Sequence, residues 1–209
     1  MECARIRILC VDDHRIVREG IAVIVDRQPD MKVIGSAASG EEAIQLFRRH
    51  RPDVTLMDLQ LGAMGGVDAI REIRRIDPQA RIVVLTIYRG DEDIHRALEA
   101  GAATYLLKDT LSDDLIRTIR EVRAGAHPMG PVVEASLAQR AAGPTLTRRE
   151  IQVIELVAQG MRNKEIAALL GISEETAQVH VKNILAKLKV RDRSAAITAA
   201  LRRGIIHIS

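Results

Sequence analysis

Asp53-Val54-Thr55-Leu56-Met57-Asp58 is the stretch that decides the fold, because it predicts a short buried strand (Asp53–Met57) that ends on an acid. Four further β-rich apolar runs predict strands of the same kind. They are continuously apolar rather than alternating, which is typical of a parallel sheet covered on both faces. The four runs are Arg5–Val11, Met31–Ala37, Arg81–Thr86 and Ala103–Leu107.

A segment with apolar residues at helical spacing follows each strand. These segments begin near residues 14, 39, 66, 91 and 111, and Ser39 with Glu42 predicts a capping box at the second. Five strand–helix repeats predict an α/β doubly wound, five-stranded parallel sheet with right-handed crossovers. In such a sheet the functional residues gather at the carboxyl ends of the strands.

Polar residues stand at the carboxyl ends of four predicted strands. Asp12 and Asp13 follow the first, Asp58 the third, Thr86 ends the fourth, and Lys108 follows the fifth. Each alone has a plainer explanation as a helix cap, a turn hydroxyl or a solvated cation. Together they predict a site for phosphoryl transfer, because clustered carboxylates suit Mg²⁺ and one carboxylate can attack phosphorus. Lys108 and Thr86 would then bind the phosphoryl oxygens.

Residues 5–124 resemble the receiver domain of bacterial two-component response regulators, which has a flavodoxin-like fold. The motifs are VDDH (11–14), PDVTLMDL (52–59), the strand ending at Thr86, and ATYLLKD (103–109). The resemblance implies a sensor histidine kinase, or a small phosphodonor, as partner. It also implies Asp58 as phosphoacceptor, Asp12, Asp13, Asp58 and the Gln60 carbonyl as Mg²⁺ ligands (Asp12 through water), and Thr86, Tyr105 and Lys108 as phosphoryl-binding and switch residues.

The loop after Asp58 departs from the family pattern. Where family members commonly carry Pro and an acid, this chain has Gly62 and Gly65, in the sequence Leu61-Gly62-Ala63-Met64-Gly65-Gly66. Because Gly admits more conformations than Pro, we expect a looser loop and altered phosphorylation kinetics. The departure removes no acceptor, metal or switch residue.

Residues 125–144 predict an interdomain linker between a receiver domain at 1–124 and a second domain at 145–209. The linker holds three Pro and three Gly, with at most a short helix around Val132–Ala141. Residues 1–124 contain 19 Lys and Arg against 21 Asp and Glu, whereas residues 145–209 contain 11 against 6. A basic C-terminal domain favours a polyanionic partner, although a solvated basic face would have the same charge.

The C-terminal region predicts a small all-α domain with a helix-turn-helix. Thr147 and Glu150 form a capping box, a short helix at 164–170 closes at Gly171, and Ser173 caps a longer helix that runs to about Leu188. Periodicity leaves one face of that longer helix for solvent or for the DNA major groove. An ordinary helical bundle with a solvated polar face is the alternative. We define the recognition face as Gln178, Val179, Lys182, Asn183 and Ala186.

Residues 146–196 resemble the LuxR-type DNA-binding domain over its whole length, so the chain resembles the NarL/FixJ class of response regulators. Family members usually carry Val-Lys where this chain has Ala177-Gln178, which removes a cation and should weaken the electrostatic part of binding. The resemblance implies contacts with double-stranded DNA from Thr176, Gln178, Val179, Lys182 and Asn183, with Lys187 near the DNA backbone.

A last helix starts at Asp192. The resemblance implies that it supports a homodimer on DNA, as a two-fold operator requires. The alternative is that its small residues pack only within their own domain. The candidate dimerisation residues are Ala195, Ala196, Ala199 and Ala200.

The resulting hypothesis is a cytoplasmic, phosphorylation-dependent, DNA-binding transcriptional regulator that is not an enzyme. No apolar run is long enough to span a membrane, and no secretion signal is evident. Cys3 and Cys10 suit a reducing compartment. Three aromatic residues argue against a LuxR-type sensor of small molecules, and Gln60, where haloacid-dehalogenase-type phosphatases need a second acid, argues against a phosphatase. A regulator of the same architecture that works without phosphorylation is the remaining alternative.

Overall fold

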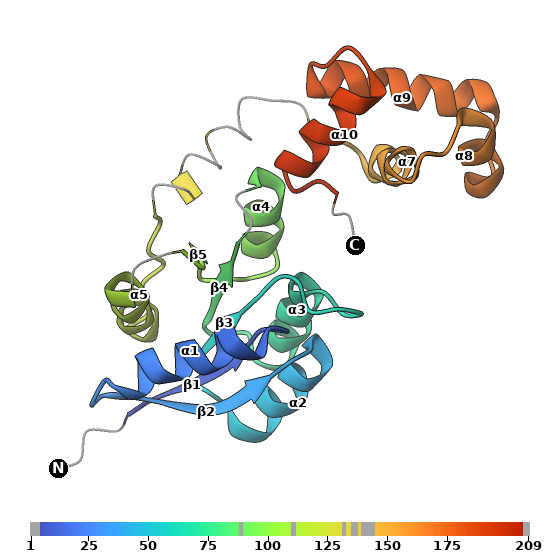
Figure 1. Ribbon diagram of the computed structural model, residues 1–209. Coiled ribbons are helices and arrows are strands. Elements are labelled where there is room, and N and C mark those ends of the chain that lie inside the picture. The colour runs from blue at the N-terminus through green and yellow to red at the C-terminus, as the bar shows by residue number, and fades with distance from the viewer. Residues whose placement is uncertain are drawn as a thin grey trace. The chain divides into compact units, whose positions relative to one another are not determined.

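Five parallel strands form the sheet of the N-terminal region in this computed structural model (Figure 1). The structure describes residues 5–87, 90–109, 112–130, 133, 134, 138 and 145–206, so most of the helix predicted around Val132–Ala141 lies outside the described residues. The chain divides into two compact units, residues 1–87 with 95–133 and residues 88–94 with 134–209.

The sheet has the order β2-β1-β3-β4-β5. Its register pairs Val11 with both Ala37 and Met57, and Thr86 with Leu107, so that the carboxyl ends of neighbouring strands lie at one edge. The strand order reverses at β1, which confirms the doubly wound parallel sheet. The strands are β1 (Ile6–Val11), β2 (Met31–Ala37), β3 (Val54–Met57), β4 (Ile82–Thr86) and β5 (Thr104–Leu107).

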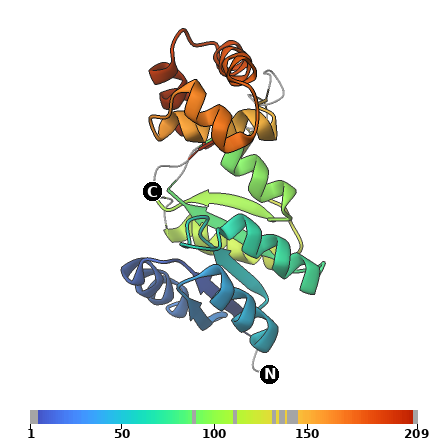
Figure 2. The same cartoon turned by 90° about the vertical axis from the view of Figure 1, so that its right-hand side faces the viewer.

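Helices cover both faces of the sheet. Helices α1 and α5 lie on one face, and α2 and α3 lie on the other (Figures 1 and 2). Their starts agree with the predicted starts to within one residue. The helices are α1 (Arg15–Asp26), α2 (Gly40–His50), α3 (Gly66–Ile76), α4 (Asp91–Glu99) and α5 (Ser112–Arg123).

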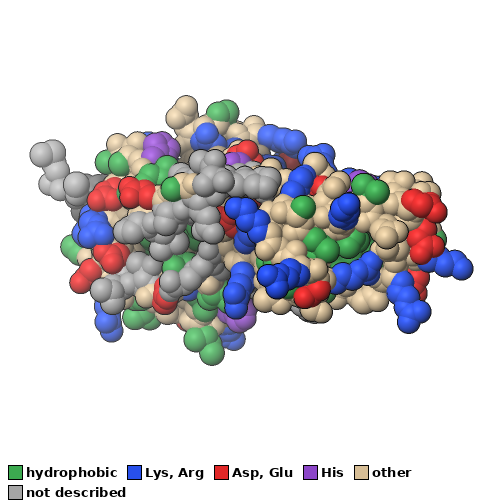
Figure 3. Space-filling model, turned by 90° about the horizontal axis from the view of Figure 1, so that it is seen from above, with side chains coloured by type: hydrophobic (Ala, Val, Ile, Leu, Met, Phe, Trp, Pro, Cys, Tyr) green, Lys and Arg blue, Asp and Glu red, His purple; other side chains and the backbone are tan. Residues whose placement is uncertain are grey.

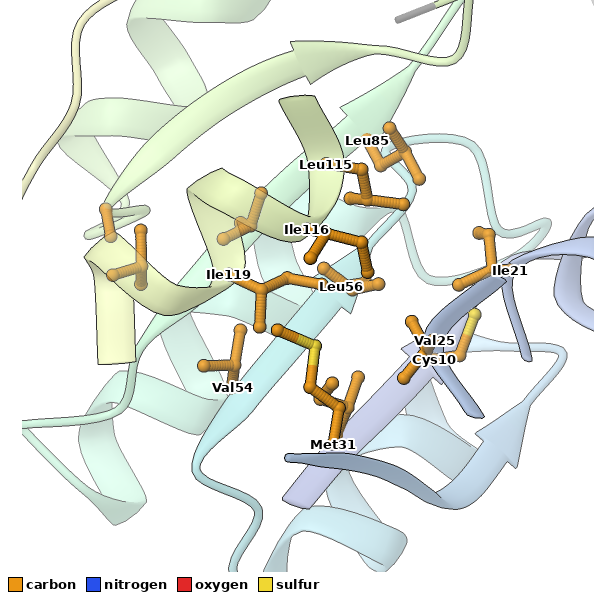
Figure 4. Close-up of a cluster of buried hydrophobic side chains, with 14 residues drawn as sticks. Cys10, Ile21, Val25, Met31, Val54, Leu56, Leu85, Leu115, Ile116 and Ile119 are labelled. Atoms are coloured by element: carbon orange, nitrogen blue, oxygen red, sulfur yellow. The ribbon is translucent and has the colours of Figure 1, made fainter. Parts of the chain in front are cut away.

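A core of aliphatic side chains joins α1 and α5 to the sheet. In Figure 4, Ile116 and Ile119 of α5 lie against Leu56 of β3, with Val25 of α1 and Met31 of β2 beside them. Burying each such side chain contributes about 1.5–3 kcal/mol. This packing fixes the strands whose ends carry the polar residues.

The start of α2 differs in one detail from the predicted capping box. The Ser39 hydroxyl accepts a hydrogen bond from the Glu42 amide (3.2 Å), as predicted. The Glu42 carboxylate, however, accepts from the amide of Ala38 (2.7 Å) instead of from that of Ser39. The Glu42 side chain therefore satisfies a donor one residue before the cap.

The second unit contains α7 (Arg148–Ala158), α8 (Asn163–Leu170), α9 (Glu174–Leu188) and α10 (Arg193–Arg202). The predicted capping box of Thr147 and Glu150 is present at α7. Gly171 ends α8 at φ 64°, a left-handed conformation that favours glycine, and the hydroxyl of Ser173 caps α9. The pair α8–α9 forms the predicted helix-turn-helix.

The core of the second unit is built from the inward faces of all four helices. Val181 and Ile184 of α9 are buried, as periodicity predicted. The other buried members of this core are Val153, Ile154, Val157, Ile166, Ala167, Ala177, Ala196, Ala200, Ile205 and Ile206.

Within the described residues, no helix is both long and apolar enough to cross a membrane.

Candidate functional site

Backbone hydrogen bonds at the carboxyl edge of the sheet bring the acids and the lysine together. The amide of Asp58 donates to Val11 O (2.9 Å), and that of Lys108 donates to Thr86 O (2.8 Å). The amide of Asp12 likewise donates to Ala37 O (3.1 Å). The ladder thus continues one residue beyond the strands, which places these side chains in one cluster.

The Lys108 ammonium bridges two buried carboxylates. Its Nζ lies 2.6 Å from Asp12 Oδ2 and 2.7 Å from Asp58 Oδ2. The remaining oxygens are also bonded, since Asp12 Oδ1 accepts from the His14 amide (2.9 Å) and Asp58 Oδ1 from the Leu59 amide (2.7 Å). Every carboxylate oxygen of this pair therefore has a donor inside the protein.

Burial raises the pKa of the Asp58 carboxyl above its usual range. The Lys108 ammonium opposes that rise, and the neighbouring Asp12 carboxylate adds to it. For Lys108, burial acts to lower the pKa, but hydrogen bonds to Asp12 and Asp58 outweigh it, so the pKa is raised. The lysine therefore stays charged and offsets the repulsion between the two acids.

Asp12, Asp13 and His14 present ligand atoms within 4.8 Å of one another. His14 Nδ1 lies 2.6 Å from Asp13 Oδ1, and Arg18 braces the same turn by donating to Asp12 O (2.6 Å). Asp12 is 1% exposed, whereas the Asp13 side chain is 42% exposed and can keep water ligands. Carboxylate oxygens with access to water are the donor set that fits Mg²⁺. Sequence reasoning gave His14 no role, although it stands inside the VDDH motif.

The other predicted site residues belong to the same edge. Thr86 ends β4 and is fully buried, Tyr105 in β5 is 3% exposed, and Gln60 is exposed in the loop after β3. The hydroxyl and the ring are thus already packed inside the protein. The roles given to these three residues remain predictions.

The loop after Asp58 uses its glycines for specific conformations. Gly62 adopts φ 75°, a backbone angle that Pro cannot reach. The loop of this chain therefore follows a path that a loop with Pro at this position could not take. A Cβ on Gly40 would meet Met64 at 2.9 Å, so Met64 lies against the start of α2. The predicted looseness of this loop remains a prediction.

Gly66 is a site residue that sequence reasoning missed. A Cβ there would lie 2.0 Å from Asp58 O and 2.7 Å from Leu59 Cα. Its amide donates to Leu59 O (2.8 Å), so α3 begins directly against the backbone of Asp58 and Leu59. The sequence feature that could have indicated this role is the position of Gly66 at the end of a glycine-rich loop.

The recognition face on α9 is exposed over its whole length, as periodicity predicted. Gln178, Lys182, Asn183 and Ala186 are exposed, and Val179 is 54% exposed. Within the described residues, the polar side chains of this face have no hydrogen-bonded or ionic partner. Figure 3 shows Lys and Arg side chains spread over one face of the C-terminal helices.

Lys187 is placed differently from the other predicted DNA contacts. Its Nζ lies 2.6 Å from Oε2 of Glu150, which is 3% exposed at the start of α7. Although burial acts to raise it, the pKa of Glu150 is lowered by its hydrogen bonds with Lys187 and Thr147. Lys187 thus binds α9 to α7 in this structure.

The four alanines of α10 do not share one surface. Ala196 (1% exposed) and Ala200 (0%) are buried in the core of their own unit, whereas Ala195 and Ala199 are half-buried. Ala196 and Ala200 therefore pack within their own domain, and the dimerisation role given to the four alanines remains a prediction. Successive residues of an α-helix are rotated by about 100° around its axis, so Ala195 and Ala199 face a different direction from Ala196 and Ala200.

Comparison with known protein families identifies both regions. The response regulator receiver domain matches residues 8–120, and the luxR family of bacterial regulatory proteins matches residues 144–200. The chain belongs to the response regulator family. It is a two-component, DNA-binding transcription regulator with a receiver domain and a LuxR-type domain.

Individual relatives agree along nearly the whole chain. The response regulator protein VraR of Staphylococcus aureus (strain NCTC 8325) is 37% identical over 206 residues, covering 96% of this chain and 99% of that protein. The crystal structure of the response regulator ChrA, from a heme-sensing two-component system, is 34% identical and covers 97% of this chain and 100% of that one, with a TM-score of 0.59. A structure of two RcsB dimers bound to two parallel DNAs shares the fold at 24% identity, with a TM-score of 0.69 and coverage of 95% and 98%.

Proposed function

We propose that a sensor histidine kinase, or a small phosphodonor, phosphorylates this regulator on Asp58. The observation that carries the proposal is the Lys108 ammonium held 2.7 Å from an Asp58 oxygen in a buried acidic cluster. An Asp58 oxygen would attack the phosphorus, form the P–O bond of an acyl phosphate and release the donor group with its bonding electron pair. Lys108 would then pair with the new phosphoryl oxygens.

We assign the Mg²⁺ site to Asp13, Asp58 and the Gln60 carbonyl, with Asp12 acting through water. When bound, Mg²⁺ offsets the charge that repels a phosphoryl donor from carboxylates. Lys108 has to release Asp12 or Asp58 in part when a cation and a phosphoryl group arrive. His14, whose imidazole contacts Asp13, would orient that carboxylate.

The switch that follows would use Thr86 and Tyr105. Phosphorylation adds charge and acceptor oxygens, which favours a conformation in which the Thr86 hydroxyl bonds to the phosphoryl group. Tyr105 is already buried, so its part would be a rearrangement within the interior rather than entry from solvent.

The output would be recognition of double-stranded DNA by α9. Gln178 and Asn183 are suited to base edges, Val179 to a thymine methyl group, and Lys182 to phosphate or guanine. Thr176 lies in the first turn of α9, where the N-cap hydroxyl of Ser173 holds its amide. We do not give Lys187 a primary phosphate contact, because it neutralises Glu150.

We further propose that the phosphorylated protein acts in the cytoplasm as a homodimer and catalyses no reaction on other molecules. Ala195 and Ala199 remain candidates for the dimer contact. RcsB, which shares this fold, is a dimer in its DNA complex. A regulator independent of phosphorylation is the second candidate, favoured by the altered loop beside Asp58, in which Gly62 stands in place of Pro and adopts φ 75°.

The test is to measure dimerisation and DNA affinity with Mg²⁺ and beryllofluoride, in the wild type and in Asp58→Asn. Mass spectrometry after treatment with a small phosphodonor places the modification. We expect one added phosphoryl group and tighter DNA binding in the wild type, and neither in Asp58→Asn. Strong DNA binding that beryllofluoride leaves unchanged would instead support the second candidate.

A further inference from the structure

A small basic cavity lies at the amino-terminal edge of the sheet, opposite the acidic cluster. Its volume is about 200 Å³. Arg74 from the end of α3, Arg81 before β4 and His127 after α5 contribute its cationic or protonatable side chains, and no acid among the described residues lines it. All of these residues lie in the first compact unit.

The two arginines differ from other arginines near this edge. Arg120 pairs with Asp30 (2.9 Å) and Arg123 with Asp53 (3.1 Å). Within the described residues, neither Arg74 nor Arg81 has a carboxylate partner, and each is half-buried. Positive charge that is partly removed from water and not neutralised by the protein attracts an anion.

Arg74 is held in place by the backbone around it. Its Nη1 donates to Ala80 O (3.2 Å). A Cβ on Gly101 would lie 2.6 Å from Arg74 Nε, and Gly101 has φ 105°. Gly101 thus has two roles, because it forms the turn before β5 and leaves room for the Arg74 side chain. The Arg74 guanidinium is therefore held at the cavity.

His127 joins the cavity to the start of the linker. Its Nδ1 lies 3.3 Å from Ala103 O, an acceptor, so Nδ1 carries the proton and Nε2 is left for another partner. One residue later, Pro128 O accepts from the buried Thr104 hydroxyl (2.5 Å). The linker therefore begins as a strap, residues 126–130, that is hydrogen-bonded to Ala103 and to Thr104, the first residue of β5.

We propose that this cavity binds a small phosphate dianion, either inorganic phosphate or a small phosphomonoester, and that the bound anion fastens the strap to the receiver domain. Guanidinium groups match phosphate oxygens in a bidentate geometry. A dianion between Arg74, Arg81 and a protonated His127 would join α3 and β4 to the strap. The proposal is independent of phosphorylation at Asp58.

The competing explanation is that the arginines only offset the helix carbonyls at this edge. The carboxyl ends of α3 and α5 lie here and carry partial negative charge. Arg74 already serves one carbonyl, that of Ala80. If this were the whole role, added phosphate would have no defined binding position.

The test is a titration of the full-length protein, without Mg²⁺, with inorganic phosphate, with glycerol phosphate and with acetate at matched ionic strength. The readouts are the ring proton resonances of His127, assigned with His127→Gln, and hydrogen exchange of the strap amides. We expect a saturable shift and slower strap exchange with phosphate. A shift with glycerol phosphate alone would assign the site to phosphomonoesters, and acetate should give neither.

Two variants and one control make the result decisive. Arg81→Gln should weaken phosphate binding by roughly fivefold, and Arg74→Gln with Arg81→Gln should abolish it. Arg75→Gln is the control, because Arg75 is exposed on the same helix and pairs with Glu72. Arg81→Gln removes no hydrogen bond within the described residues, so it should fold even if the double variant does not. Non-saturating shifts, or equal weakening by Arg75→Gln, would overturn the proposal.

Discussion

The acidic cluster and the recognition face are both polar, but they are built in opposite ways. At the acidic cluster, Asp12 and Asp58 are 1% and 4% exposed, and Lys108 bonds to both of them. On α9, Gln178, Lys182 and Asn183 are exposed and have no internal partners within the described residues. Buried charges need partners inside the protein, whereas exposed ones are left for partners outside.

This difference predicts where substitutions act. Changes at the acidic cluster should alter the stability of the receiver domain as well as its chemistry. Changes on the recognition face should alter DNA binding and leave folding intact.

The largest effect is expected from Gly66→Ala. The new methyl group would overlap Asp58 O, a backbone atom that cannot move away cheaply. We expect the free energy of unfolding to fall by on the order of 4 kcal/mol or more, measured by urea denaturation. Gly65→Ala is the matched control, since its nearest neighbour would be 3.8 Å away. Equal stability of the two variants would contradict the close packing of α3 on the Asp58 backbone.

Lys108→Met should come next, with a loss of about 3 kcal/mol at neutral pH, because two buried carboxylates lose their common cation. The pKa of Asp58, already raised, should rise further without Lys108. A raised pKa contributes stability at low pH that is lost as the pH rises through it, so the deficit should shrink on acidification. Thermal melting across pH measures this.

Lys32→Met serves as the control for Lys108→Met. Lys32 is exposed and lies 3.9 Å from Asp26, so its loss should change stability by less than about 0.5 kcal/mol. A deficit in Lys108→Met that grows on acidification would show that the two carboxylates do not depend on Lys108.

Lys187→Met should destabilise the C-terminal domain by about 2 kcal/mol, because Glu150 would remain buried without its cation. The pKa of Glu150 is lowered, so the contribution of this pair is present above the ordinary carboxyl pKa and is lost as the pH falls through the lowered value. Thermal unfolding measured at several pH values checks both statements.

Lys182→Met gives the matched comparison on the same helix. It should leave stability nearly unchanged but reduce the salt dependence of DNA binding by about one unit of log–log slope. If Lys187→Met instead lowered that slope without affecting unfolding, then Lys187 would contact phosphate and its bond to Glu150 would be incidental.

The smallest effect is expected from Val179→Ala. Val179 is 54% exposed, so stability should change by less than about 0.5 kcal/mol. DNA affinity should fall by about 1 kcal/mol if its methyl groups contact a base, as a binding titration can measure. Val23→Ala, at a residue 53% exposed on α1, should alter neither property.

Sequence periodicity predicted the fold well because both core patterns depend on local spacing. Continuous apolar runs gave all five strands, and the 3.6-residue period separated Val181 and Ile184 from Lys182 and Asn183. Caps at Thr147 and Ser173 also follow local rules. Position at the ends of parallel strands was enough to group Asp12, Asp58 and Lys108 before any distance was known.

Pairings between distant segments were not available from the sequence. Lys187 and Glu150 are separated by 37 residues, and the local sequence around neither one indicates the other as its partner. The local sequence likewise does not show that Arg74 lies against Gly101, or which half of the α10 alanines is buried. Local spacing says which face a residue lies on but not which side chain meets it there.

The sequence by itself determined the class of this protein, its two domains, the acidic edge of the sheet and the exposed face of α9. Only the tertiary structure decided that Lys108 joins Asp12 to Asp58, that Lys187 is occupied by Glu150, and that Arg74 and Arg81 border a cavity beside residues 125–127. The physical reason is that secondary structure follows from neighbours along the chain. The partner of a buried charge is fixed only when packing brings separate segments within hydrogen-bonding distance.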